Sequence, residues 1–576
     1  MDAAVGDVAD TGPGDRAAGS GAPAPDPAAG SAVGAASSRR LLVAVLVAVN
    51  LPILVATVRA LARGWQPVGD NGILLVRARD VGTGHHPLLG SWTSASLVLD
   101  DHVNNPGPLY FDVVAPAVKL LGPWVGLAIG VMLANMAASS LAVVAARRLA
   151  GTETMVAVAL AVAGLQWALG SELLFDMWQP NALVLPFFAF LVVAAVLATG
   201  DVWLAPWVVG LGSLIVQTHM SHAVLVGVLT LTCGGLCVLA RRRAGEPTAW
   251  RRPLAWTGAV AVLAWIQPLI EQLAGTGRGN MSRIAAAASG GEASSIGWGR
   301  ATRLVVEVTA MGPWFTRSSY DSAVPPTPPD EPIRGIVGAG PALAVLAALA
   351  VLVLVAAAWS ARAGRPRLAT MVAVGGLALA TAYVALATSP VNYIAVAVHQ
   401  MRWLWPIAAF LTAATLAVLL SAARARAPAP AHRVAVAGVA AAAVVVALAN
   451  LPTHTSRAPG PTDTADHLAS GVELMAQLGA LEGRGTVLYD TSTLLFAEPY
   501  SGMTFAEMQD RGIPFVFDDE VSVRQFGEGR RHDGSADVRV WQVEGQAARD
   551  VPPGAERVAF VEGPSGPVAL FVEPLG

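Results

Sequence analysis

The chain has 576 residues, of which 54% are hydrophobic and only 13% are charged, and its formal net charge is −3. Soluble domains carry about 25% charged residues, so this composition excludes a chain built only of soluble domains. The small net charge excludes a general electrostatic attraction to nucleic acid. The two cysteines, Cys233 and Cys237, share one apolar segment. We expect two buried thiols on one helix face, with a metal or redox pair as the alternative.

The N-terminal segment differs from the rest of the chain. Residues 1–38 are mainly Ala, Gly, Pro, Asp and Ser and show no periodicity. Such a segment cannot bury enough apolar surface to offset the entropy of ordering it, so we predict a disordered cytoplasmic tail. It is not typical of a secretory signal, because the apolar stretch follows a long acidic tail.

After this tail, apolar residues occur in blocks of about 17 to 25, the helix length that crosses a bilayer core. We therefore predict an all-α polytopic membrane domain over residues 39–452. Eleven segments qualify as spans, at about 41–62, 124–146, 154–170, 182–199, 203–219, 222–240, 254–271, 337–359, 368–388, 402–421 and 433–451. Pro268 is expected to bend or end the seventh span near Gln267.

Arginine clusters near the span ends predict the orientation, because short cytoplasmic loops carry an excess of positive charge. These arginines are Arg39, Arg40, Arg147, Arg148, Arg241, Arg242, Arg243, Arg251, Arg252, Arg362, Arg365, Arg367, Arg424, Arg426 and Arg433. With an odd number of spans they all fall on one side, which we take to be the cytoplasmic side of the plasma membrane. The loops 63–123 and 272–336 and the tail 453–576 then lie outside the cell.

The tail 453–576 has the pattern of a small α/β domain. Residues 464–481 read as an amphipathic helix. Five short apolar or alternating runs bounded by Gly, Pro or Asp read as strands, at 486–489, 514–517, 538–543, 557–561 and 568–572. A chain of this length suffices for a small domain with its own core.

Polar side chains gather in the first external loop and at the external ends of later spans, and such residues are functional candidates in a membrane protein. The candidates are Asp70, His85, His86, Asn105, Gln217, His219, Glu271, Asn280, His399 and Arg402. A carboxylate can act as a general base, and an arginine can bind a phosphate through two parallel hydrogen bonds. The alternative interpretation is that these residues are polar only because the loops of any membrane protein are polar.

The first loop carries its motifs in a particular order. Gly69-Asp70-Asn71-Gly72 opens a segment of helical spacing that ends at Ala78-Arg79-Asp80, and Pro106-Gly107-Pro108-Leu109-Tyr110 follows. This order resembles the GT-C superfamily of polyprenyl-phosphate-sugar-dependent glycosyltransferases, in particular the branch with protein O-mannosyltransferases and lipid A aminoarabinose transferases. Late in the chain, His399-Gln400-Met401-Arg402-Trp403 resembles the Arg-Tyr-containing start of a late span in these enzymes.

The resemblance implies an inverting transferase that moves a sugar from a polyprenyl-phosphate donor to a hydroxyl of a cell-envelope glycan, lipid or protein. Asp70 would be the general base, and Arg402 would bind the phosphate. The family has an Asp-Glu pair where this chain has Asp70-Asn71. A second carboxylate must therefore come from elsewhere, with Asp80, Asp100 and Asp101 as the candidates.

The residues leave other interpretations open. Asp70 could cap the helix that follows it, and Arg402 could extend to the membrane surface beside Trp403 and Trp405. No metal-ligand spacing is present, although Asp70 with His85 or His86 could hold a divalent metal. There are two alternative functions: a lipid or glycan transporter or flippase, and a non-catalytic envelope assembly protein.

Overall fold

The computed structural model describes residues 27–96, 101–245, 250–275, 277–289, 295–311, 314–317, 338–390, 398–454, 465–495 and 498–575. The chain separates into two compact units, 1–44 and 45–576. Helix α1 (Pro27–Ala62) begins inside the segment predicted to be disordered, and the remainder of that segment, 1–26, lies outside the described residues.

The described chain contains ten helical segments that are long and apolar enough to cross a membrane. They are Ser38–Ala62 of α1, α5 (Pro123–Ala150), α6 (Thr152–Leu169), Gln179–Ala198 with α7 (Gln179–Ala182) and α8 (Val184–Ala198), Met220–Arg243 with α10 (Ala223–Arg243), α11 (Arg251–Ala274), α15 (Ala339–Arg362), α16 (Pro366–Thr388), α17 (Leu404–Arg426) and α18 (Ala429–Ala449). Each coincides with a predicted span, so the all-α polytopic membrane class is confirmed.

The predicted span at 203–219 coincides with an apolar helix, Val202–Thr218, whose regular part is α9 (Ala205–Thr218) and which is shorter than the ten long segments. It starts with a 3₁₀ turn and ends where His219 becomes extended, with φ of −151°. One detail differs from the expectation. Helix α11 continues through Pro268 to Ala274, so the proline does not end that span. Cys233 and Cys237 of α10 are buried and free, as expected.

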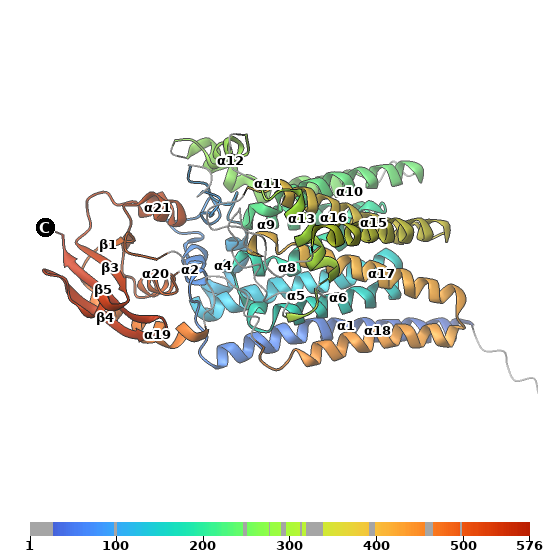
Figure 1. Ribbon diagram of the computed structural model, residues 1–576, viewed down its shortest axis with the longest axis horizontal. Coiled ribbons are helices and arrows are strands. Elements are labelled where there is room, and N and C mark those ends of the chain that lie inside the picture. The colour runs from blue at the N-terminus through green and yellow to red at the C-terminus, as the bar shows by residue number, and fades with distance from the viewer. Residues whose placement is uncertain are drawn as a thin grey trace, which may run out of the picture. The chain divides into compact units, whose positions relative to one another are not determined.

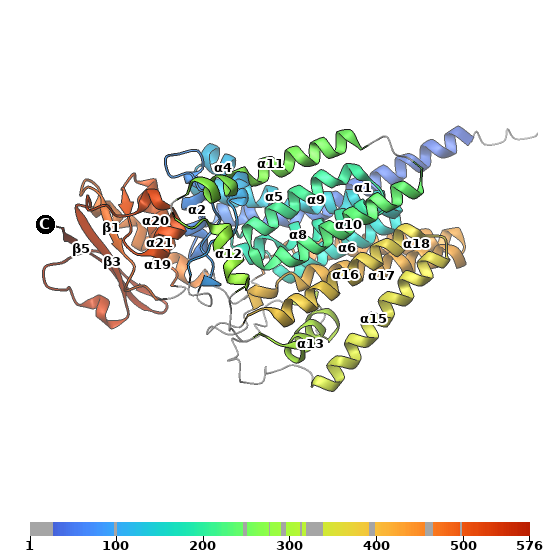
Figure 2. The same cartoon turned by 90° about the horizontal axis from the view of Figure 1, so that it is seen from above.

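Helix α8 forms the centre of the bundle. All of its residues are buried, and it is apolar around its whole circumference, which is the composition of a helix surrounded by other helices. It packs against α5, α9, α10, α16 and α17, an arrangement that can be followed in Figures 1 and 2.

The residues from 465 onward form an α/β layer around a five-stranded sheet. The elements are α19 (Ala465–Ala476), β1 (Val487–Asp490), α20 (Ser501–Asp510), β2 (Phe515–Val516), α21 (Glu520–Phe526), β3 (Val538–Glu544), β4 (Glu556–Gly563) and β5 (Gly566–Pro574). The strand order is β2-β1-β3-β5-β4, with β1 parallel to β2 and β3 and with β5 antiparallel to β3 and β4. The predicted α/β class of this region is confirmed, although α20 and α21 were not predicted. The expected domain boundary at 453 adjoins 455–464, which lie outside the described residues.

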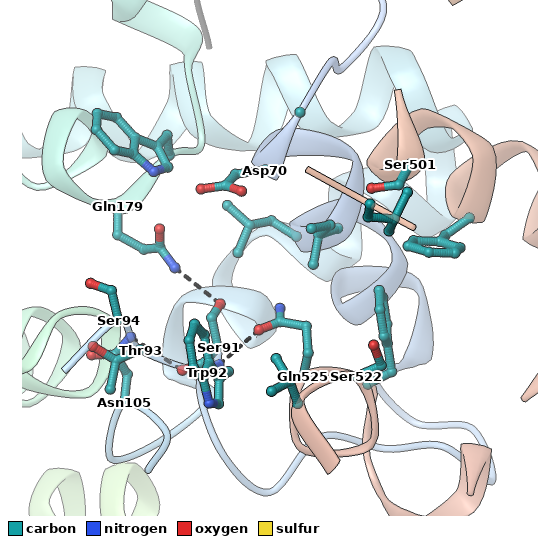
Figure 3. A pocket seen from close by; sticks show the side chains of 18 of the residues that line it. Asp70, Ser91, Trp92, Thr93, Ser94, Asn105, Gln179, Ser501, Ser522 and Gln525 are labelled. Atoms are coloured by element: carbon teal, nitrogen blue, oxygen red, sulfur yellow. Dashed lines mark hydrogen bonds between the residues drawn. The ribbon is translucent and has the colours of Figure 1, made fainter. Parts of the chain in front are cut away.

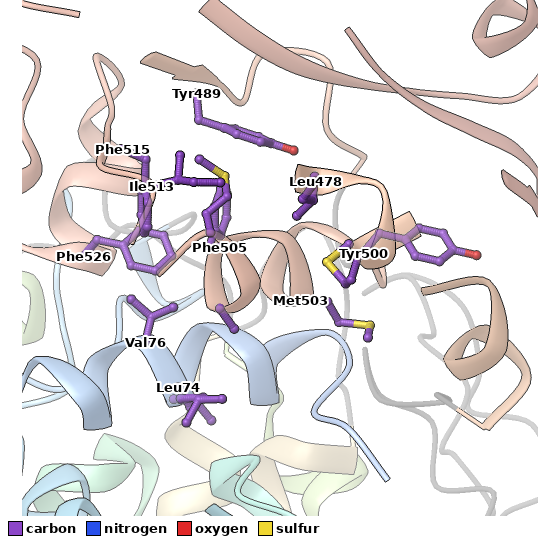
Figure 4. Packing of buried hydrophobic residues seen from close by; sticks show 14 of the residues in the cluster. Leu74, Val76, Leu478, Tyr489, Tyr500, Met503, Phe505, Ile513, Phe515 and Phe526 are labelled. Carbon is purple, nitrogen blue, oxygen red and sulfur yellow. The ribbon is translucent and has the colours of Figure 1, made fainter. Parts of the chain in front are cut away.

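The α/β layer shares its core with the first loop, which contains α2 (Asp70–Asp80) and α4 (Leu109–Leu121). Leu74 and Val76 of α2 belong to one buried cluster with Phe505, Phe515 and Phe526 (Figure 4). The ring centroids of Phe505 and Phe526 lie 5.1 Å apart in an edge-on arrangement, which aromatic pairs favour. The first loop and the C-terminal layer therefore fold around a common core.

Helices α2 and α20 touch through their backbones, and both views place α20 between the sheet and α2 (Figures 1 and 2). A Cβ atom at Gly72 would lie 2.3 Å from the carbonyl carbon of Gly502, and a Cβ at Gly502 would lie 2.1 Å from the carbonyl oxygen of Gly69. The amide of Gly69 also donates to the carbonyl of Pro499 at 2.9 Å. Only glycine permits this approach at both positions.

A buried ionic cluster closes the same interface. Asp80 of α2 accepts from Arg77 at 3.2 Å, from Arg530 at 2.8 Å and from Gln509 at 2.8 Å. Burial lowers the pKa of Arg77 to about 10, so its guanidinium stays protonated at neutral pH. Arg77 belongs to α2 itself, whereas Arg530 and Gln509 come from the C-terminal layer, so two of these three partners reach Asp80 only when this layer is docked on α2.

The glycine contact yields a stability prediction. Gly502→Ala should lower the free energy of unfolding by about 1–3 kcal/mol, because the added methyl forces two backbones apart. The melting temperature of the purified protein in detergent, together with limited proteolysis of the C-terminal layer, measures the effect. Gly438→Ala in α18 is the matched control, since a Cβ there meets nothing within 4 Å. Equal melting temperatures for the Gly502 variant and the wild type would contradict the close contact.

Candidate active site

A cavity of about 510 Å³ lies between the first loop, the starts of two spans and the C-terminal layer (Figure 3). Its lining residues are Gly69, Asp70, Ile73, Leu74, Ser91, Trp92, Thr93, Ser94, Asn105, Trp178, Gln179, Pro180, His219, Gln400, Thr491, Leu494, Leu495, Glu498, Ser501, Phe505, Asp519, Val521, Ser522, Gln525 and Phe526. A volume of this size accommodates a small molecule or part of a larger one.

Asp70 is the first residue of α2 and lies at the cavity wall (Figure 3). The capping position belongs to Gly69, so Asp70 is not the helix cap. The pKa of Asp70 is raised to about 6, mainly by burial and also by the charges of Asp176 and Glu498, while a hydrogen bond with the Trp178 side chain opposes the rise. Asp70 is therefore mostly ionised at pH 7 and is a stronger base than an ordinary carboxylate.

Asn71 forms hydrogen bonds next to Asp70, one of them with a second carboxylate, Asp176. Its side-chain amide donates to Asp176 at 2.6 Å, and its side-chain oxygen accepts from the amide of Met177 at 2.9 Å. Asp176 also accepts from Asn181 at 2.9 Å. Burial raises the pKa of Asp176, and these hydrogen bonds oppose the rise. A glutamate at position 71 could not donate to Asp176, whereas the amide of asparagine can.

The carboxylates that raise the pKa of Asp70 are Asp176 and Glu498, and two of the three suggested from the sequence, Asp80 and Asp101, are instead engaged elsewhere. Asp80 is engaged in the ionic cluster with Arg77 and Arg530. Asp101 forms an ion pair with Arg283, and Asp100 lies outside the described residues. Sequence proximity to Asp70 was a poor guide, because the carboxylates that influence its pKa come from segments far along the chain.

The C-terminal layer supplies polar groups that sequence reasoning missed. Asp519 caps α21 by accepting from the amide of Ser522 at 2.8 Å, and Thr491 donates to its other oxygen at 2.8 Å. The side-chain oxygen of Gln525 accepts from the amide of Trp92 at 2.8 Å. Thr491 and Asp519 follow β1 and β2, at the carboxyl ends of parallel strands, where α/β sheets commonly bind ligands. In the sequence, the acidic pair Asp518-Asp519 just after the predicted strand 514–517 was the signal that could have identified these groups.

Three of the residues singled out from the sequence line the cavity: Asp70, Asn105 and His219. The side-chain oxygen of Asn105 accepts from the amide of Met220 at 2.9 Å, which fixes the first loop to the turn between α9 and α10. His219 lies in this turn, with its Nδ1 2.7 Å from the hydroxyl of Ser221. The loop and this turn are therefore held together at the cavity wall.

Three other candidates make contacts between segments and do not line the cavity. Gln217 donates to the carbonyl of Ala264 at 2.6 Å. The carboxylate of Glu271 accepts from the amide of Asn280 at 3.0 Å. The side chain of Asn280 donates to the carbonyl of Asn104 at 3.0 Å and accepts from its amide at 2.9 Å. The bonds between Asn280 and Asn104 join the first and second loops, and the other two contacts join α9 to α11 and α11 to the second loop.

Among the remaining candidates, His85, His86 and Arg402 do not line the cavity. His85 is exposed, while His86 accepts at Nδ1 from the amide of Gly82, and its Nε2 lies 3.0 Å from the side-chain oxygen of Gln267. Arg402 is buried, with its guanidinium 5.1 Å from the ring centroid of Trp405. The backbone of His399 belongs to η5 (Val398–Met401), but its side chain lies outside the described residues.

The cavity is acidic and partly aromatic. Asp70, Glu498 and Asp519 line it, whereas no arginine or lysine does so among the residues that the structure describes. Trp92 and Trp178 contribute aromatic surface. Carboxylates and amides can hydrogen-bond hydroxyl groups, so this lining suits an uncharged polyhydroxylated molecule better than an anion.

A metal centre is not built from the described residues. Within the described ranges, no group of three His, Cys, Asp or Glu side chains is arranged to hold an ion. Asp70 lines the cavity, whereas His85 and His86 do not. A role for a divalent metal stays a prediction.

Fold and cavity together define a multi-pass membrane protein whose first loop and C-terminal α/β layer enclose an acidic cavity at one end of the helical bundle. No protein-family model matches the sequence, and no curated protein matches it significantly. Among solved structures, the chain is similar to the crystal structure of ArnT from Cupriavidus metallidurans bound to undecaprenyl phosphate. The TM-score is 0.41 and the sequence identity is 13%, over 92% of this chain and 97% of that chain.

The charge environment of Asp70 can be tested without a known substrate. A water-soluble carbodiimide reacts with protonated carboxyl groups, so its labelling of Asp70, followed by peptide mass spectrometry, should fall as pH rises through about 6. Glu498→Gln removes a nearby negative charge and should move this midpoint to lower pH.

Asp519→Asn is the matched control, because Asp519 lines the same cavity but is not among the charges that shift the pKa of Asp70. It should leave the midpoint unchanged. A midpoint near pH 4 in the wild type, or equal shifts in both variants, would refute the proposed influence of Glu498.

Proposed function

We propose that the protein is a membrane glycosyltransferase that moves a sugar from a polyprenyl-phosphate donor to a hydroxyl of a cell-envelope glycan, lipid or protein. The observation that carries the proposal is Asp70, a carboxylate with raised basicity at the wall of a cavity next to the membrane. The order of motifs in the first loop supports the same reaction class. The N-terminus would be cytoplasmic, and the cavity would face the outside of the plasma membrane.

Asp70 acts as the general base of an inverting displacement. The oxygen of the acceptor hydroxyl attacks the anomeric carbon, and Asp70 takes the hydroxyl proton as the new C–O bond forms. The bond from that carbon to the polyprenyl phosphate breaks at the same time, and the phosphate leaves with the bonding electrons. A base whose pKa lies near the working pH combines a large ionised fraction with a strong pull on the proton.

The other lining residues bind and orient the sugars. Trp92 and Trp178 offer aromatic faces, and Asn105, Gln179 and His219 offer hydrogen-bonding groups beside them. These groups place the acceptor hydroxyl near Asp70, which lowers the entropic part of the barrier.

Arg402 is our candidate for binding the leaving phosphate. It follows Gln400, which lines the cavity, by two residues. An arginine matches the geometry of a phosphate and would balance the negative charge that develops on it. His85, His86, His399, Glu271, Asn280 and Gln217 remain secondary candidates around the same loops.

A non-catalytic glycan-binding role in envelope assembly is the second candidate. It is favoured by the lining of the cavity, which within the described residues contains no cation to stabilise a leaving phosphate. Under this alternative the cavity holds a glycan, and Asp70 serves only as a hydrogen-bond acceptor.

The two functions differ in the expected behaviour of Asp70→Asn. Membranes that contain the protein are supplied with a panel of radiolabelled polyprenyl-phosphate sugars, and transfer of label to envelope material is measured. Removal of a general base should reduce transfer about 10²- to 10⁴-fold. Asp550→Asn, an exposed carboxylate outside the cavity, should retain full transfer. Failure of the wild type to turn over any donor would favour the non-catalytic function. Full activity of the Asp70 variant would instead show that Asp70 is not the general base of the transfer.

A further inference from the structure

A second polar cavity lies at the opposite ends of the spans. It measures about 420 Å³ and is lined by Arg147, Arg148, Leu149, Ala150, Gly151, Glu153, Thr154, Gly364, Arg365, Pro366, Arg367, Leu368 and Ser421. Two tight turns form it, one between α5 and α6 and the other between α15 and α16. The guanidinium of Arg367 donates to the carbonyl of Arg148 at 3.4 Å, so the two turns meet at the cavity.

The lining of this cavity is strongly basic. Four arginines line it together with a single carboxylate, Glu153. Glu153 is buried and already accepts from Arg424 at 3.2 Å, and His432 lies at the same distance from it. Outside the lining, Asp201 lies 4.0 Å from Arg148, but the Arg148 side chain is exposed and that of Asp201 is half-buried. The cavity therefore carries excess positive charge and suits an anion.

The cavity also has an apolar side. Leu149 and Leu368 are buried in its wall, and Ala150 and Pro366 lie beside them. The spans α5 and α15 end here, and α6 and α16 begin here, so the site lies at the level where a helix passes from hydrocarbon to water.

We propose that this cavity binds the phosphodiester head group of an anionic phospholipid from the leaflet on this side. Arginines match the phosphate through paired hydrogen bonds, and the apolar wall accepts the first part of the acyl chains. Basic pockets between spans on the cytoplasmic side of membranes commonly take lipids of this class. The proposal does not depend on the glycosyltransferase reaction.

The chain contains a matched control for the charge alone. Arg242 and Arg243 are the last residues of α10, at the end of this helix that is distant from the cavity lined by Asp70, and both are exposed. They contribute the same kind of charge at the same predicted membrane surface but do not line the basic cavity. If the cavity itself binds the lipid, substitutions of its lining arginines should weaken lipid binding. Substitutions of Arg242 and Arg243 should not.

The test uses the full-length protein extracted from bilayers of phosphatidylglycerol and phosphatidylcholine, with retained lipids counted by native mass spectrometry. The wild type should retain one phosphatidylglycerol in preference to phosphatidylcholine. Arg147→Gln with Arg365→Gln should weaken this retention by about thirtyfold, from roughly fivefold for each arginine near an anionic surface. Arg242→Gln with Arg243→Gln should retain the lipid as the wild type does.

Three results would overturn the proposal. One is equal loss in both double variants, which would indicate a general surface charge. Another is undiminished retention in the cavity variant. The third is displacement of the lipid by millimolar inorganic phosphate, which would assign the cavity to a soluble anion. Because a glutamine variant could fail to fold, Arg147→Lys with Arg365→Lys is tested as well. This variant keeps the charge and should retain more phosphatidylglycerol than the glutamine variant.

Discussion

The contact between α2 and α20 is the constraint on which the rest of the candidate site depends. Gly72 and Gly502 bring two backbones together, and the buried carboxylate of Asp80 is balanced by arginines from both sides of the interface. Asp70 lies two residues before Gly72 in the same helix, so this contact fixes its position relative to the sheet. The first loop and the C-terminal layer can form the cavity only as a docked pair, because each leaves buried charge or apolar surface uncovered without the other.

The surroundings of Asp70 combine two opposing requirements. A general base must be ionised near neutral pH, yet it gains basicity only if the protein disfavours its charge. Partial burial and two nearby carboxylates supply that unfavourable environment, while the hydrogen bond with Trp178 limits it. Asn71 makes this arrangement tolerable, because its amide donates to Asp176 where a second acid would add a like charge. At position 71 the chain therefore has an amide, and the carboxylate beside it comes from Asp176.

The membrane domain carries cavities of opposite charge at its two ends. The cavity under the α/β layer is lined by carboxylates, amides and aromatic rings, whereas the cavity between the α5–α6 and α15–α16 turns is lined by arginines. Between them α8 is apolar on all sides and is enclosed by other helices. The bundle thus separates two kinds of polar surface at its two ends.

Local patterns in the sequence were sufficient for ten of the spans and for the five strands. Apolar length sets where a helix can cross a bilayer, alternation sets where a strand can pair, and both are properties of contiguous residues. The sequence did not indicate that Asp176 and Glu498 surround Asp70, or that Asn280 and Glu271 serve to join loops. These relations bring together residues from distant parts of the chain, and burial and charge–charge distances exist only once the chain has folded. The pKa of Asp70 and the shape of its cavity were therefore decided by tertiary packing.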